Sequence, residues 1–320
     1  MPDDQGVARG REAEHPQHIP PRGWKDVLVR SWQEISDNNI FLVAGGVTYA
    51  VLVALFPALA ALVSLYGLVL DPAQVEKQVA ALTGVVPQQT QDLISAQLHQ
   101  LVTASSGALG FGAIFGLVVA LWAASRGMSG LINALNIAYE QKETRGFVQL
   151  NRLALTLTLG MIVGGLVVIA LVGVLPAVIG AIGLGSVAQW LLLILEWPLL
   201  LLCVMTALAV LYRYAPDRRV AKWRWITPGA VVATVLWLLA SIAFSAYVAN
   251  FNSYNKTYGS LGAVVVLLTW LYWSAFIVLV GAVINTQTER QTRRDSTVEP
   301  PKPMGQRGAT AADTLGRDTG

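Results

Sequence analysis

Six long apolar stretches dominate the pattern of hydrophobic and polar positions between Ile40 and Asn285, and almost every charged residue lies between them. A bilayer core about 30 Å thick requires roughly 20 apolar residues in each helix that crosses it. A backbone inside hydrocarbon must satisfy its own hydrogen bonds, as an α-helix does. The pattern therefore predicts an all-α polytopic membrane protein with six transmembrane helices, at about residues 41–70, 109–136, 153–183, 188–212, 226–249 and 261–285.

The segments that flank these stretches differ from them in composition. Residues 1–22 and 288–320 are polar, and we expect both to be disordered tails around a transmembrane domain at 23–287. Over residues 23–38, apolar side chains recur at helical spacing, which predicts a short amphipathic helix along the membrane surface. The first external loop, at 71–108, has a similar pattern and is long for an irregular connection, so we expect short amphipathic helices there.

Connections rich and poor in Lys and Arg alternate along the chain. The segment before the first stretch and the connections at 137–152 and 213–225 each carry at least three of these residues. The connections at 71–108 and 250–260 carry one each, and 184–187 carries none. Because cytoplasmic loops are enriched in Lys and Arg, we expect both termini to be cytoplasmic in a multi-pass protein of the bacterial inner membrane.

Composition narrows the class of function. The chain is 54% hydrophobic and 13% charged, with a formal net charge of +3. Its basic residues are spread over several loops and form no single groove lined with aromatic rings, so we expect no nucleic-acid partner. Cys203 is the one cysteine, and His, Asp and Glu show no metal-ligand spacing. We therefore predict no metal, no cofactor and no enzymatic activity.

Two ionisable residues lie well inside apolar stretches, where charge is costly and often functional. Glu196 lies roughly 12 Å into the fourth stretch, at about 1.5 Å per residue. It could be a proton or cation site, a polar anchor for a headgroup, or a protonated carboxyl bonded to a neighbouring helix. Arg126 lies toward the inner end of the second stretch. It could bind an anionic substrate, extend toward the interface, or pair with Glu34 or Asp37.

Four segments carry a recognisable pattern that spans about residues 24–287. They read GGVTYAVLVALFPALAAL, LWAASRGMSGLINALNIAY, LYRYAPDRRVAKWRWITPGA and SYNKTYGSLGAVVVLLTWLYWSAFIVLVGAVIN. With them the chain resembles the YihY / virulence factor BrkB family of bacterial inner-membrane proteins. The resemblance implies a six-helix fold with both ends cytoplasmic. Some members of that family carry the label ribonuclease BN, and others are linked to serum resistance or to movement of envelope lipids.

The motifs and the isolated charges together predict a substrate-binding set, which consists of Glu196, Arg126, Tyr49, Asn136, Tyr254 and Tyr258. The last two belong to a polar, aromatic turn that could line an entrance or lie at headgroup level. The family often has a Gly-Ala-Glu-Leu-Asn pattern in the fourth motif, but this chain has Val283 at the acidic position. A mechanism that depends on that carboxylate is therefore not expected here.

Three functions stay open at this point. We expect a transporter, flippase-like protein or channel for a lipid or small amphiphile, because prolines inside three stretches, two isolated intramembrane charges and an external amphipathic cap favour one. A non-catalytic envelope scaffold is the alternative, and a ribonuclease is much less favoured. Membrane lipids are the expected partners, and a homo-oligomer is compatible with the sequence.

Overall fold

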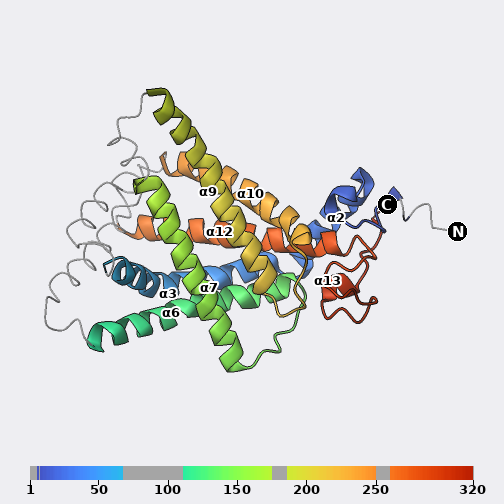
Figure 1. Cartoon of the computed structure of the whole chain (residues 1–320), viewed down its shortest axis with the longest axis horizontal. Coiled ribbons are helices and arrows are strands. Elements are labelled where there is room, and N and C mark those ends of the chain that lie inside the picture. The colour runs from blue at the N-terminus through green and yellow to red at the C-terminus, as the bar shows by residue number, and fades with distance from the viewer. Residues whose placement is uncertain (1–5, 7, 68–110, 175–185, 250–259, 320) are drawn as a thin grey trace.

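The computed structural model describes residues 6, 8–67, 111–174, 186–249 and 260–319. Within them the regular elements are helices, and the one β-bridge pairs Ala221 with Thr297 (Figure 1). The long helices are α3 (Ile40–Gly67), α6 (Phe111–Ala138), α7 (Phe147–Ile169), α9 (Ser186–Tyr214), α10 (Trp223–Ala249) and α12 (Ser260–Glu289). The shorter ones are η1 (Pro16–His18), α2 (Pro21–Asp37), the π-helical turn η2 (Ala170–Val174) and α13 (Thr310–Asp313).

Each long helix overlaps one of the six predicted stretches, so the predicted all-α architecture is confirmed. Among the described residues, five helices are long and apolar enough to cross a membrane, and α3 makes a sixth when it is counted together with α2. These two helices are bent by 64° relative to each other. The amphipathic helices predicted at 71–108 lie outside the described residues.

The long helices pack in the spatial order α3, α6, α7, α9, α10 and α12, and α12 returns to α3 (Figure 1). Small residues permit the closest approaches between them. A Cβ built on Gly127 of α6 would lie 2.6 Å from the Cβ of Ala54 on α3. In the same way, Gly229 of α10 lies against the backbone of Gly281 on α12. The bundle is therefore held by close backbone contacts as well as by interlocking side chains.

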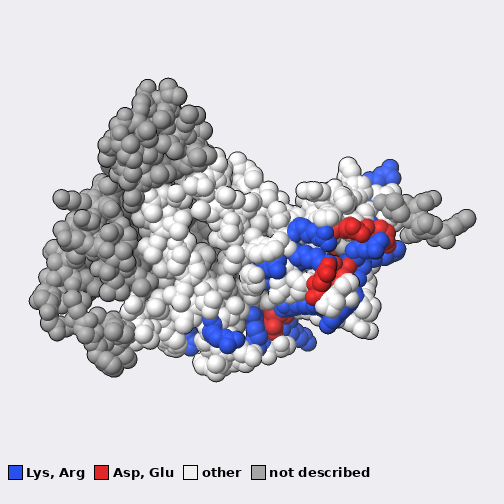
Figure 2. All heavy atoms as spheres, in the orientation of Figure 1, with Lys and Arg blue, Asp and Glu red and all other residues white. Residues whose placement is uncertain are grey.

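Charged residues gather at one end of the bundle, which we call the charged end (Figure 2). It consists of residues 8–39, 136–146, 215–224 and 289–319, which include α2, α13, the last residues of α6 and α12, and the connections after α6 and α9. It holds most of the Lys and Arg residues from which the cytoplasmic orientation was predicted. The cytoplasmic orientation of this end stays a prediction.

The described residues of the terminal segments, which the sequence predicts to be disordered tails, contact each other and α2. Arg11 donates to the carbonyl oxygen of Gly316 at 2.7 Å, and Arg30 donates to that of Arg317 at 2.8 Å. Residues 314–319, which we call the C-terminal strap, are thereby held against α2 and the end of α12. Arginine side chains hold the strap by bonding its backbone carbonyls, and the disorder of the tails stays a prediction.

Candidate functional site

Arg126 lies near the middle of α6, about 18 Å from the helix end at Ala138 if each residue rises about 1.5 Å. Its side chain is exposed, and its guanidinium carbon lies 4.6 Å from the centre of the Trp122 ring. Trp122 is itself 53% exposed. Glu34, a predicted partner of Arg126, instead contacts Asn38 and Arg290 at the charged end. Arg126 is therefore a cation stacked on one aromatic ring on the open surface of α6.

This open surface is a continuous stripe along α6. Val119, Trp122, Arg126, Asn133 and Ile137 recur at helical spacing, and each has an exposed side chain. Apolar exposed side chains are expected on a helix that faces lipid, whereas an arginine and an asparagine on such a face are costly. The stripe thus places two polar groups where the described helices do not cover them.

Tyr49 lies on a matching stripe of the adjacent helix α3. The side chain is 71% exposed, and Leu42, Gly46 and Val53 continue the same open face. Its neighbour in sequence, Ala50, packs against Gly130 of α6, about one helical turn from Arg126. Two of the predicted residues, Tyr49 and Arg126, are therefore exposed on neighbouring helices at similar levels.

Asn136 is in a different environment, because it is buried at the charged end. Its amide nitrogen donates to Glu143 at 2.8 Å, and its amide oxygen accepts the backbone N–H of Asp217 at 2.7 Å. Arg145 bonds Glu143 and the carbonyl oxygen of Ala215, which completes the junction between the connections after α6 and α9. Both ends of the Asn136 side chain are therefore occupied by protein groups that hold two loops together.

The remaining predicted residues are only partly placed. Glu196 belongs to α9, two residues before Pro198, but its side chain lies outside the described part of the structure. Tyr254 and Tyr258 also lie outside the described residues. Their place in a substrate site stays a prediction.

A buried ion pair at the charged end was not predicted from the sequence. The guanidinium of Arg218 bonds both carboxylate oxygens of Glu289, at 3.0 and 2.7 Å, and the two side chains are 2% and 0% exposed. Ser296 donates to the same carboxylate, and the Tyr139 ring lies 5.2 Å below the guanidinium. Glu289 follows the predicted end of the sixth stretch, so apolarity alone did not mark it.

A second buried polar group joins α6, α10 and α12 beside this pair. The Asn285 side-chain oxygen accepts the backbone N–H of Gly229 at 2.7 Å, and its nitrogen donates to the Tyr139 hydroxyl at 3.3 Å. Asn285, Gly229 and Tyr139 all belong to the motifs noted in the sequence. Their spacing along the chain did not indicate that they meet.

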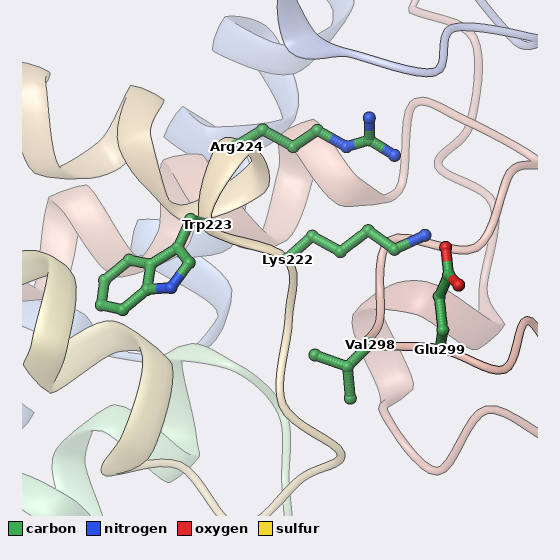
Figure 3. A pocket seen from close by; sticks show the side chains of 5 residues that line it. All are labelled: Lys222, Trp223, Arg224, Val298 and Glu299. Atoms are coloured by element: carbon green, nitrogen blue, oxygen red, sulfur yellow. The ribbon is translucent and has the colours of Figure 1, made fainter.

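The charged end also has an open depression of about 470 Å³, which is lined by Lys222, Trp223, Arg224, Val298 and Glu299 (Figure 3). The Lys222 amine points toward the carboxylate of Glu299, and Trp223 points away from it (Figure 3). Arg224 contacts a ring nitrogen of His15 at 3.0 Å. The cations of this depression therefore already face protein partners. Within the described residues, no group of three or more His, Cys, Asp and Glu side chains could hold a metal ion.

Comparison with known proteins identifies the family. Residues 31–305 match the family described as "Virulence factor BrkB". The "Putative ribonuclease-like protein YfkH" of Bacillus subtilis is 32% identical over 253 residues, which are 77% of this chain and 88% of that protein. The "UPF0761 membrane protein YihY" of Salmonella typhimurium is 31% identical over 269 residues, 83% of this chain and 88% of that protein. No solved structure matches the chain significantly. With its series of apolar helices, the chain is a multi-pass bacterial membrane protein that belongs to the BrkB virulence-factor family.

Proposed function

We propose that this protein moves an anionic lipid or small anionic amphiphile across the bacterial membrane, with Arg126 and Trp122 contacting its headgroup. The observation that carries the proposal is the exposed guanidinium of Arg126, stacked on Trp122 halfway along α6. A cation at such a depth is costly unless an anion compensates its charge. Within the described residues, no carboxylate lies within 4.0 Å of Arg126, so the charge is open to a ligand.

The chemistry of the pair favours a phosphate or a carboxylate. Trp122 stacks on the guanidinium by a cation–π contact, which leaves the N–H groups along the edge of Arg126 free to donate. Arginine binds planar or tetrahedral oxyanions with two parallel hydrogen bonds. The apolar side chains of the same stripe, Val119 and Ile137, would lie against the hydrocarbon part of the molecule. Tyr49 offers an exposed hydroxyl on the adjacent helix.

Leaflet exchange in reconstituted liposomes tests the proposal. We expect the full-length protein to accelerate exchange of fluorescent phosphatidylglycerol more than that of fluorescent phosphatidylcholine. A hydrogen bond to a charged group contributes about 1.5–3 kcal/mol, so Arg126→Gln should slow exchange of the anionic lipid roughly 10- to 100-fold. Arg126→Lys keeps the charge but lacks the two parallel N–H donors of the guanidinium, so we expect an exchange rate between those of the wild type and Arg126→Gln.

Arg152→Gln is the matched control, because Arg152 is an exposed arginine on the first turns of α7 and its removal changes the net charge equally. We expect this variant to exchange both lipids at the wild-type rate. If Arg126→Gln and Arg152→Gln have the same rates, Arg126 plays no part in recognition. If no envelope lipid exchanges faster with the protein than without it, lipid transport is excluded and the scaffold function takes its place.

A further inference from the structure

Two carboxyl groups meet at the charged end, where α2 bends into α3. Glu34 lies on the last turn of α2, and Glu140 follows the end of α6 with a left-handed backbone (φ +50°). The two carboxyls lie close enough to share a hydrogen bond when one of them is protonated. Arg290, which follows α12, places one guanidinium nitrogen 2.7 Å from Glu140 Oε1 and 3.8 Å from Glu34 Oε2. One arginine is thus shared between two carboxyls that come from different elements.

Glu34 also holds the bend itself. The side-chain amide of Asn38 donates to Glu34 Oε1 at 2.6 Å, and the Asn38 backbone N–H donates to the Glu34 carbonyl oxygen at 3.0 Å. The next residue, Asn39, has φ of +50°, which ends α2 and allows α3 to start at 64° to it. The other oxygen of Glu34 faces the amide of Gln287 at 3.4 Å. One Glu34 oxygen therefore contacts the α2–α3 bend, and the other contacts α12.

The environment of the pair favours one bound proton. Burial raises the pKa of Glu34 to about 7, and the hydrogen bond with Glu140 and the charges of Glu140 and Asp37 add to this effect, while Arg290 opposes it. Burial also acts to raise the pKa of Glu140, but hydrogen bonds with Arg290 and Glu34 hold it below its ordinary value. Two carboxyls that interact so closely cannot both ionise easily, so they titrate as a pair. Below about pH 7 the proton lies on Glu34 and can be donated to Glu140.

We propose that Glu34 and Glu140 form a proton-binding site, which holds the α2–α3 bend when a proton is bound and loosens it when the proton leaves. With the proton, the carboxyls attract each other through a hydrogen bond. Without it, two negative charges face one another, and Arg290 can fully neutralise only one of them. Because α3 packs against α6 and α12, a change at the bend reaches the helices that carry Tyr49 and Arg126. The site is independent of the proposed transport, since it concerns only proton binding and the bend.

Infrared difference spectroscopy of the full-length protein in lipid nanodiscs detects the proton directly, because a protonated carboxyl has a C=O stretch that the carboxylate lacks. We expect one carboxyl band that disappears with a midpoint near pH 7. Glu34→Gln should abolish this titration. Glu140→Gln removes the neighbouring negative charge and should weaken proton binding by Glu34 at least about tenfold, which lowers the midpoint by one pH unit or more. Arg290→Gln should raise the midpoint.

Glu143→Gln is the matched control, since Glu143 is a half-buried carboxylate of the same end with its own arginine, Arg145. The Arg145 hydrogen bond holds the pKa of Glu143 below its ordinary value, so this variant should leave the neutral-pH band unchanged. A titrating band near pH 7 whose amplitude is the same in Glu34→Gln as in the wild type, or a midpoint that Glu140→Gln leaves in place, would overturn the shared proton. The midpoint measured in Glu140→Gln tests the shared proton even if Arg290→Gln does not fold.

Spin labels report the bend. Labels on cysteines that replace Arg22 of α2 and Val53 of α3, in a Cys203→Ala background, give a distance distribution across the junction. We expect this distribution to broaden between pH 6 and pH 8 in the otherwise native protein, pH values that lie about one unit either side of the Glu34 midpoint. With Glu34→Gln added, the distribution should stay narrow at both pH values. Identical distributions for the native site at the two pH values would show that the proton does not control the bend.

Discussion

Gly229→Ala tests whether the backbones of α10 and α12 meet as closely as the structure shows. A Cβ at residue 229 would lie 2.6 Å from both Cγ and Oδ1 of Asn285, and nearer still to the carbonyl oxygen of Gly281. Ordinary contact begins at 3.4 Å, so the helices must separate by at least 0.8 Å, the difference between the two distances. Overpacking of this kind costs about 1–3 kcal/mol.

The same shift weakens a buried hydrogen bond, because the Gly229 N–H donates to Asn285 at 2.7 Å. A buried group without its partner costs about 1–3 kcal/mol. Alanine recovers up to about 1 kcal/mol through its higher helix propensity. We therefore expect Gly229→Ala to lower the free energy of unfolding by about 2–4 kcal/mol, which thermal unfolding in detergent, followed by tryptophan fluorescence, measures as a lower melting temperature.

Gly160→Ala on α7 is the matched control. A Cβ there meets no atom within 4 Å, so the propensity gain has nothing to oppose it. We expect this variant to melt at the wild-type temperature or slightly above it. Equal melting temperatures for the two variants would refute the close approach of α10 and α12.

Three further predictions concern the charged end. Arg218→Met leaves Glu289 buried without its partner and should lower the free energy of unfolding by about 3–5 kcal/mol. The double variant Arg218→Met with Glu289→Leu should recover most of this loss, which a double-mutant cycle of thermal unfolding measures. Burial raises the pKa of Glu34 from 4.5 to about 7, so the contribution of its proton to stability is complete below pH 4.5 and is lost as the pH rises to 7. The wild-type melting temperature should therefore fall relative to that of Glu34→Gln between pH 4.5 and pH 7, and a constant difference would contradict this prediction. Gly316→Val places side-chain atoms where the Arg30 guanidinium lies at 2.5 Å, so it should displace the C-terminal strap and accelerate cleavage by trypsin after Arg317, as measured by mass spectrometry.

The apolar stretches predicted the long helices well because lipid and the protein interior both favour apolar side chains. A helix surrounded by either must be apolar on most sides, so no knowledge of its neighbours is needed. The boundaries were less predictable. α12 continues past residue 285 to Glu289, where Thr286 and Thr288 are buried and hydrogen-bonded to backbone carbonyls. Polar residues that find partners only in the fold do not mark a helix in the sequence.

The amphipathic pattern of α2 was also only partly informative. Val27 and Ile35 are buried in the structure, whereas Leu28 and Trp32 of the same predicted face are exposed. The sequence cannot separate these roles, because packing against protein and contact with lipid select the same residue types. The part of the apolar face that meets protein depends on the 64° bend between α2 and α3.

The candidate sites also include residues that the sequence alone could mark and residues that only the fold brings together. Arg126 could be singled out because a charge within an apolar stretch is visible in the sequence alone. Glu34, Glu140 and Arg290 could not, because they lie in polar segments far apart in the chain and are joined only by tertiary contacts. Asn136 was singled out from its motif, and the structure shows that loop contacts occupy its side chain.

The position of α12 has a consequence for biogenesis. It is the last of the described long helices to be synthesised, yet it packs against α2, α3, α6 and α10, which come before it. Until it leaves the insertion machinery, α3 and α10 lack the helix that packs between them and closes the bundle. Nascent chains interrupted before this helix should therefore expose the faces of α3 and α10 that it covers, so that membrane proteases and cellular quality control can recognise incomplete copies by this gap.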